Sequence, residues 1–227
     1  MRILVVEPDD SSSRIMEIFL NSAGHHVEIV TTAEEAIEYL ELYPYDIVLT
    51  EIDLPDMSGI RMVRKMRTQK IVTPVLCVSQ RSDVETKVQA LQAGSDGYIT
   101  KPYHRDELSG VIAAIIRRSA GHASPSIRVG ELEILTDERR VLVSGKGVHL
   151  TGKEYQIMEL LALRKGVTLS KEQFINHLYG GRDEPEQKIV DVFVCKLRKK
   201  LGQGGLAIAT VWGRGYVLQD PARAAAA

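Results

Sequence analysis

Short apolar runs alternate with helical patterns along the first half of the chain. In the helical patterns, apolar residues recur three and four positions apart, as Ile15, Ile18 and Phe19 do near the start. The runs expected as strands are 3–6, 27–30, 46–50, 74–79 and 97–100, and the expected helices are 11–23, 33–42, 60–67, 83–93 and 106–118. These alternating units predict an α/β fold: a five-stranded parallel sheet with helices on both faces, in the doubly wound, flavodoxin-like arrangement.

The second half of the chain has a different pattern. Residues 127–150 alternate in short runs separated by polar turns, which predicts a small antiparallel sheet. Thr151 and Glu154 fit a capping box that opens a helix running to about Arg164. Two further helices and a hairpin are expected at about 170–180, 185–201 and 210–217. Three helices followed by a hairpin predict a winged helix-turn-helix domain.

Composition marks a boundary between these halves. Residues 119–126 are mostly small, with one glycine and one proline, which is typical of a linker. Residues 1–120 hold 13 Lys and Arg against 18 Asp and Glu, a net charge of −5, and residues 121–227 hold 16 against 12, a net charge of +4. A basic domain that suits a polyanion therefore follows an acidic one. We predict a first domain at 1–118, a linker at 119–126, a second domain at 127–220 and a disordered tail at 221–227.

The sequence shows no sign of a membrane or secretory protein. No apolar run reaches the roughly 18 to 20 residues of a membrane-spanning helix. The first apolar run is too short for a signal-peptide core and leads directly into acidic residues. Cys77 and Cys195 are far apart and have no metal-binding spacing. These features favour a reduced, cytoplasmic protein and predict no metal site.

Side chains with phosphate and cation chemistry follow the predicted strands. Parallel strands end at the same edge of a sheet, so acids, a hydroxyl and a lysine are expected to meet there. They are Glu7, Asp9, Asp10, Glu51, Asp53, Ser79 and Lys101. Carboxylates suit Mg²⁺, and the lysine and the hydroxyl suit phosphate oxygens. The alternative is an acidic, solvated rim of loops with no chemistry of its own.

Residues 1–118 resemble the receiver domain of bacterial two-component response regulators. The matching segments are 3–7, 46–59, 79, 93–94 and 98–102. The resemblance implies that an aspartate after the third strand accepts a phosphoryl group, and that this aspartate and an acidic pair after the first strand hold Mg²⁺. It also assigns Ser79 and Lys101 to the phosphoryl oxygens and makes Tyr98 an aromatic switch.

Two positions depart from that pattern. Glu51 stands where the family has the phosphoacceptor aspartate, and Pro8 replaces the second acid of the pair, leaving Glu7 with Asp9 nearby. Proline has no ligand atom, and the carboxylate of glutamate lies about 1.5 Å further out than that of aspartate. We therefore expect no phosphorylation of Glu51 and impaired Mg²⁺ binding. Glu51 either imitates a phosphoryl charge or forms a static ion pair with Lys101.

The resemblance also implies dimerisation through the fourth helix, the fifth strand and the fifth helix, by ion pairs. The charges on that face are Lys87, Asp96, Glu107 and Arg118. Gly97 and Val111 stand where the family usually has an acid and an arginine. The absence of both charges removes one ion pair from the dimer interface. Because an exposed ion pair contributes only about 0–1 kcal/mol, a homodimer is still expected.

The third helix of the second half is the most basic. The apolar stripe expected to face the core is Ile189, Val192, Phe193, Leu197 and Leu201. The cations expected outside it are Lys188, Lys196, Lys199 and part of Arg198. Such a helix fits the major groove of DNA, and Arg214, between two glycines of the hairpin, fits the minor groove. The alternative is a solvated basic face. Asp191 is expected to orient a neighbouring side chain, and Trp212 to support the wing or the core.

This half resembles the winged-helix effector domain of OmpR/PhoB-class response regulators, most closely in the CtrA group of alphaproteobacterial cell-cycle regulators. The segments that carry the resemblance are 148–156, 174–181, 189–201 and 210–218. The resemblance implies that two copies bind repeated promoter half-sites, which are of TTAA type in the CtrA group.

These features together predict a sequence-specific DNA-binding transcription regulator that is not an enzyme and works without phosphorylation. Two alternatives stay open. One is a conventional regulator that is phosphorylated at Glu51 or Asp53. The other is a protein that forms mixed dimers with a CtrA-like paralogue. RNA polymerase is a further candidate partner on promoter DNA.

Overall fold

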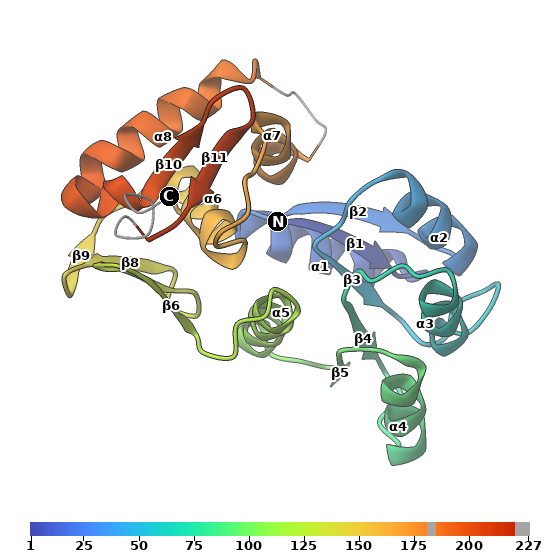
Figure 1. Cartoon of the computed structure of the whole chain (residues 1–227). Helices are drawn as coiled ribbons and strands as arrows, with labels where there is room; N and C mark the ends of the chain where they lie inside the picture. The colour runs from blue at the N-terminus through green and yellow to red at the C-terminus, as the bar shows by residue number, and fades with distance from the viewer. Residues whose placement is uncertain (181–184, 221–227) are drawn as a thin grey trace. The chain divides into compact units, whose positions relative to one another are not determined.

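A parallel sheet forms the centre of the first unit of the chain, Met1–Ser119 (Figure 1). The computed structural model describes residues 1–180 and 185–220, apart from the side chain of residue 206, so the predicted tail at 221–227 lies outside the described residues. The strands are β1 (Arg2–Val6), β2 (His26–Val30), β3 (Ile47–Thr50), β4 (Val75–Ser79) and β5 (Gly97–Thr100). Their order is β2-β1-β3-β4-β5 and every pairing is parallel, which confirms the predicted fold class.

Five helices cover this sheet. They are α1 (Asp10–Ser22), α2 (Ala33–Leu42), α3 (Gly59–Thr68), α4 (Val84–Ala93) and α5 (Arg105–Ser119). Because crossovers between parallel strands are right-handed, the strand order places α2, α3 and α4 on one face and α1 and α5 on the other. In agreement, α3 packs against both α2 and α4. The carboxyl ends of the strands meet at one edge, as the sequence predicts.

The buried face of α1 differs from the predicted one. Ile15 and Ile18 are 61% and 59% exposed, whereas Ser13, Met16 and Leu20 are buried. Apolar residues surround much of this helix, so its pattern allows more than one stripe. The stripe at positions 13, 16 and 20 is buried because it lies toward the sheet, and the predicted stripe is wrong.

The second unit, Ala120–Ala227, begins with an antiparallel sheet. Its strands, in the order β6-β7-β8-β9, are β6 (Ser126–Val129), β7 (Leu132–Leu135), β8 (Arg140–Val143) and β9 (Lys146–Val148). The helices α6 (Gly152–Leu163), α7 (Lys171–Tyr179) and α8 (Lys188–Leu201) follow, then a short 3₁₀ helix (Gly202–Ala207) and the hairpin β10 (Ile208–Val211) and β11 (Gly215–Leu218). Three helices and a hairpin give the predicted winged helix-turn-helix architecture (Figure 1).

A buried acid joins α6 to α8. The carboxylate of Glu154 accepts the Thr151 N–H at 2.7 Å, and the Thr151 hydroxyl accepts the Glu154 N–H in return, which completes the predicted capping box. The same carboxylate, which belongs to a residue only 3% exposed, accepts a hydrogen bond from Lys200 Nζ at 2.7 Å. Burial opposes ionisation, but the hydrogen bonds from Lys200 and Thr151 outweigh it and lower the pKa of Glu154. An anionic cap therefore fixes the C-terminal end of α8 against α6.

The core stripe of α8 also differs from the predicted one. Val190, Val194, Leu197 and Leu201 are buried, whereas Val192 is 45% exposed. The helix begins at Lys188 rather than at residue 185. Valines and isoleucines at several successive positions make two helical stripes equally apolar, and packing selects the one that includes Val190 and Val194.

One glycine sets the distance between α3 and the end of β3. A Cβ built on Gly59 lies only 2.2 Å from the carbonyl oxygen of Glu51, and the Gly59 N–H donates to the Ile52 carbonyl at 2.8 Å. The first residue of α3 therefore lies directly against the backbone of Glu51. A larger residue at this position has to move either the helix or the strand end.

We expect Gly59→Ala to lower the free energy of unfolding by about 1–3 kcal/mol, because the added methyl group overlaps backbone atoms. Gly110→Ala is the matched control. Gly110 lies on the exposed side of α5 with nothing within 4 Å, so alanine there raises the stability by about 0.5–1 kcal/mol. Urea unfolding followed by circular dichroism measures both variants. Equal effects of the two substitutions would contradict the steric argument.

Candidate functional site

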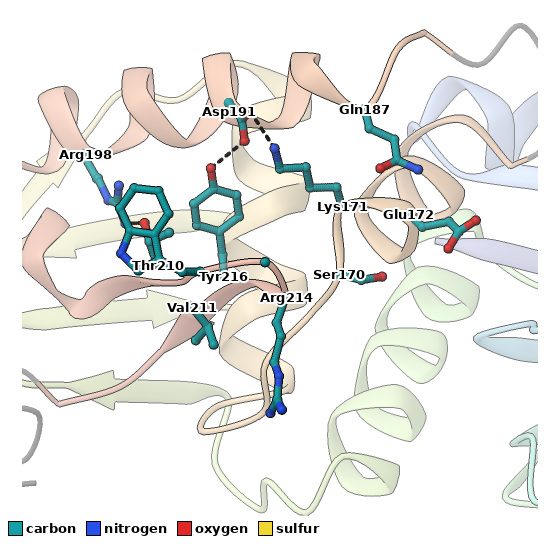
Figure 2. Close-up of a pocket in the computed structure, with 13 residues that line it drawn as sticks. Ser170, Lys171, Glu172, Gln187, Asp191, Arg198, Thr210, Val211, Arg214 and Tyr216 are labelled. Atoms are coloured by element: carbon teal, nitrogen blue, oxygen red, sulfur yellow. Dashed lines mark hydrogen bonds and ion pairs between the residues drawn. The ribbon is translucent and has the colours of Figure 1, made fainter.

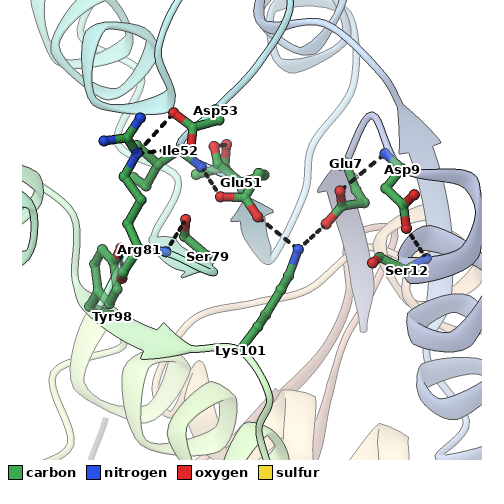
Figure 3. Close-up of polar contacts among 11 residues, drawn as sticks. Glu7, Asp9, Ser12, Glu51, Ile52, Asp53, Ser79, Arg81, Tyr98 and Lys101 are labelled. Carbon is green, nitrogen blue, oxygen red and sulfur yellow. Dashed lines mark hydrogen bonds and ion pairs between the residues drawn. The ribbon is translucent and has the colours of Figure 1, made fainter. Parts of the chain in front are cut away.

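A lysine ammonium lies between two carboxylates at the carboxyl edge of the receiver sheet (Figure 3). Lys101 Nζ is 2.5 Å from Oε2 of Glu7 and 2.8 Å from Oε2 of Glu51. Glu7 follows β1, Glu51 follows β3 and Lys101 follows β5. The three side chains are only 4%, 9% and 12% exposed, so the ion pairs are shielded from water.

Both oxygens of Glu51 are in use. Oε1 accepts the Ile52 N–H at 2.7 Å while Oε2 contacts Lys101. Burial opposes the charged form of Lys101, but the hydrogen bonds and charges of Glu51 and Glu7 outweigh it and raise the pKa of the ammonium. Lys101 therefore stays cationic at neutral pH, and the carboxylate of Glu51 is held in one orientation.

The predicted hydroxyl and aromatic residue meet on the loop after β4 instead of at Glu51. Ser79 is fully buried, and its Oγ accepts the Arg81 N–H at 3.2 Å. The hydroxyl of Tyr98 donates to the Arg81 carbonyl at 2.7 Å. Arg81, which the sequence analysis did not single out, also donates from Nε to Asp53 at 2.8 Å. Its position two residues after the site hydroxyl is the only signal that could have identified it.

Two of the predicted acids lie outside the cluster. Asp9 caps α1, where its carboxylate accepts the Ser12 N–H at 2.8 Å, and the hydrogen bonds from Ser12 lower its pKa. Asp53 is occupied by Arg81, and both of these side chains are more than half exposed. The prediction that Asp9 and Asp53 converge on Glu51 is therefore not met by the geometry, because Asp9 is engaged by Ser12 of its own helix and Asp53 by Arg81 of the loop after β4.

The residues present do not fit the Mg²⁺ ion that the family implies. A magnesium site needs several oxygen ligands around an octahedral centre. Here Pro8 offers no ligand atom, and the carboxylates of Glu7 and Glu51 each have an oxygen already bound to the Lys101 ammonium. Among the described residues, no cluster of three or more His, Cys, Asp or Glu side chains could hold a metal ion.

The predicted dimer face keeps only some of its charges free. Asp96 accepts the Val75 N–H at 2.8 Å and pairs with Arg67 at 3.3 Å, so it is engaged inside the receiver. The Lys87 ammonium lies 5.8 Å from the centre of the Tyr98 ring. Arg118 donates to a carbonyl of its own helix, and Glu107 is exposed. Asp96 is therefore already paired within its own chain, and its place in an intersubunit ion pair stays a prediction.

A groove separates α8 from the wing in the second unit (Figure 2). It has a volume of about 680 Å³. Its walls come from the start of α7, one side of α8 and the β10–β11 hairpin. The charged and aromatic residues that line it are Lys171, Glu172, Asp191, Arg198, Trp212, Arg214 and Tyr216.

Asp191 and Arg198 hold the wing against α8. Asp191 accepts from Lys171 Nζ at 2.7 Å and from the Tyr216 hydroxyl at 2.6 Å, and these hydrogen bonds lower its pKa. Arg198 donates to the Ile208 carbonyl at 2.7 Å and to Thr210 at 2.8 Å. Asp191 thus orients neighbouring side chains, as expected. Arg198 is turned toward the hairpin, where its Nε and Nη2 atoms are hydrogen-bonded, and its contact with DNA stays a prediction.

The cations that remain outward lie on α8 and on the wing turn. Lys188, Lys196 and Lys199 are exposed, and so is Arg214 between β10 and β11. Trp212 is 91% exposed, so its predicted role in the core or in wing support is wrong. Trp212 lies in the turn between β10 and β11.

Comparisons with known proteins give the same assignment for both units. The family described as "Response regulator receiver domain" matches residues 3–113, and the family described as "Transcriptional regulatory protein, C terminal" matches residues 145–218. The receiver of Francisella response regulator 1452 is similar in structure, with a TM-score of 0.50 at 27% identity, covering 52% of this chain and 98% of that one.

Two full-length relatives are similar over nearly the whole chain. The "Cell cycle transcriptional regulator CtrA" of Caulobacter vibrioides is 50% identical over 224 residues, which is 97% of each chain. The "Cell cycle response regulator CtrA" of Brucella anthropi is 52% identical over the same coverage. No helix in the described ranges is both long and apolar enough to cross a bilayer. Regulators of this type bind DNA and are not enzymes, and this chain belongs to the DNA-binding two-component response regulators of the OmpR/PhoB class, with CtrA-like sequence over its whole length.

Proposed function

We propose that this regulator binds promoter DNA without phosphorylation of its receiver. The observation that carries the proposal is the position of Lys101, whose ammonium already contacts both Glu7 and Glu51. In the family, this lysine binds the oxygens of the incoming phosphoryl group. Here its ion pairs form without one.

The environment of Glu51 argues against its acting as a phosphoacceptor. Its two oxygens are held by the Ile52 N–H and by Lys101 at 2.7 and 2.8 Å. In-line attack on a phosphodonor requires a free carboxylate oxygen in a narrow range of positions. Pro8 also removes one of the acids that would bring Mg²⁺ to the donor.

The geometry favours the static ion pair over imitation of a phosphoryl group. A phosphoryl group carries close to two charges and three oxygens, whereas Glu51 supplies one charge and two oxygens. The hydroxyl of Ser79 accepts from the Arg81 backbone, and no hydrogen bond joins it to Glu51 in the described part of the chain. To imitate a phosphoryl group, Glu51 would have to connect the end of β3 to the end of β4 through Ser79. The contacts of Ser79 do not support this connection.

For DNA, we propose that two copies bind repeated half-sites of TTAA type. The exposed lysines of α8 supply the major-groove and phosphate contacts, and Arg214 with Trp212 reaches the minor groove from the wing. Asp191 and Arg198 set the angle between α8 and the wing. Association with RNA polymerase or with a CtrA-like paralogue, and a cytoplasmic location, stay predictions.

We expect no phosphoryl transfer to the native chain. Incubation with acetyl phosphate and Mg²⁺ leaves the intact mass unchanged, because no acceptor carboxylate is free. A gain of one phosphoryl group, about 80 Da, would establish a conventional phospho-switch instead. Pro8→Asp combined with Glu51→Asp restores the family's acids, and this variant serves as the positive control for the donor.

A comparison of DNA affinity between wild type and Glu51→Gln distinguishes the static ion pair from imitation of a phosphoryl group. With a static ion pair, wild type and Glu51→Gln bind a duplex of two TTAA half-sites equally well, within about threefold, without any phosphodonor. Glutamine keeps the shape and removes the charge, so the comparison isolates electrostatics. If Glu51→Gln weakened binding tenfold or more, roughly 1.4 kcal/mol, Glu51 would be a built-in activating charge. Fluorescence anisotropy at fixed salt measures the difference.

We expect Lys196 to contact a phosphate or a base of the DNA. We expect Lys196→Ala to weaken DNA binding and to reduce the slope of log K against log salt by about one, because one fewer phosphate charge is neutralised. Lys146→Ala is the control, since Lys146 is equally exposed but lies on β9, away from α8. A Lys196→Ala variant with an unchanged salt slope would remove this lysine from the interface.

A further inference from the structure

Opposite charges are segregated onto two neighbouring helices of the receiver. The acids of α2 are Glu34, Glu35, Glu38 and Glu41, and this helix has no base. The bases of α3 and its first following residues are Arg61, Arg64, Lys65, Arg67 and Lys70, and this segment has no acid. The helices lie side by side on one face of the sheet (Figure 1).

Most of these charges point to solvent and lack partners. Glu34, Glu38, Arg61, Arg64 and Lys65 are exposed, and none of them forms an ion pair within the described part of the chain. Arg67 is the exception, because it is turned inward to the Gly94 carbonyl and Asp96. The outer surface therefore has an acidic stripe on α2 next to a basic stripe on α3, and neither neutralises the other.

The two stripes are matched along the helix axes. Both helices connect parallel strands in the same direction, so they run parallel to each other. Glu34 and Arg61 lie in the first turns of their helices, and Glu38 and Arg64 lie one turn further on. A two-fold axis parallel to the helices would place α2 of one copy over α3 of the other, acid against base. An axis perpendicular to them would place acid against acid.

We propose that two copies of this chain associate through this α2–α3 face, with Glu38 of each copy opposite Arg64 of the other. A two-fold interface requires a surface that complements itself, and adjacent stripes of opposite sign meet that requirement. Because of the two-fold symmetry, each ion pair between the copies forms twice. Leu42, which is 71% exposed at the end of α2, adds apolar area at the margin of the face. This face is separate from the one on α4, β5 and α5, so it goes beyond the proposed function.

The test is a charge exchange read by sedimentation equilibrium of the full-length protein. Arg64→Glu and Glu38→Lys each place like charges in contact, and each raises the dimer dissociation constant about tenfold or more. The double variant reverses both stripes at this position and restores association to within about threefold of wild type. Raising the salt concentration weakens the wild-type dimer, because the pairs are exposed.

Arg14→Glu is the matched control, an equal change of charge at an exposed position of α1. Several outcomes overturn the proposal: a wild-type protein that stays monomeric, single variants that dimerise normally, or a double variant no better than either single one. Dissociation by Lys87→Glu but not by Arg64→Glu assigns the dimer to the α4–β5–α5 face instead. If Arg64→Glu lowers DNA affinity with dimerisation unchanged, α3 contacts DNA and the proposal fails. Circular dichroism checks that each variant is folded.

Discussion

A buried ammonium shared by two carboxylates is the interaction on which the receiver site depends. Lys101 connects the carboxyl ends of β1, β3 and β5 through Glu7 and Glu51. Charges this far from water are stable only when they are paired, and removal of the lysine would leave both carboxylates uncompensated at a cost of about 3–5 kcal/mol. The cluster occupies the edge of the sheet where receivers of this family bind Mg²⁺ and exchange phosphate. At this edge Glu51 is one methylene longer than the family's aspartate, and Pro8 supplies no carboxylate.

The DNA-binding unit is held by ion pairs of its own. Glu154 ties one end of α8 to α6 through Lys200, and Asp191 ties its middle to Lys171 and Tyr216. Arg198 connects the same helix to β10. All of these contacts lie within the second unit, so the groove between α8 and the wing is formed without any residue of the receiver. The proposed role of the receiver is therefore in association, because none of its residues lines this groove.

The strands, the helices and the capping box could be predicted from the sequence because each has a local cause. Alternation of apolar runs with helical patterns identifies a parallel sheet. Thr151 and Glu154 satisfy each other's backbone N–H groups at the start of α6. The failures in α1 and α8 are choices between equivalent local patterns. Ile15 and Val192 belong to apolar stripes as regular as the buried ones, and only the packed sheet decides between them. The partners of Asp96 and Asp53 are arginines 29 and 28 positions away, which no local pattern indicates.

If two copies associate through the α2–α3 face as proposed, segregated charge gives the receiver a means of control that needs no phosphate. Lys101 is already paired with both Glu7 and Glu51 at the edge of the sheet. Association by exposed ion pairs depends instead on protein concentration and ionic strength, because each pair is weak and screened. Two copies on adjacent half-sites raise each other's local concentration, so weak contacts between receivers suffice to make binding cooperative. DNA occupancy would then follow the amount of the protein, and the acidic α2 and basic α3 stripes would set how steeply it does so.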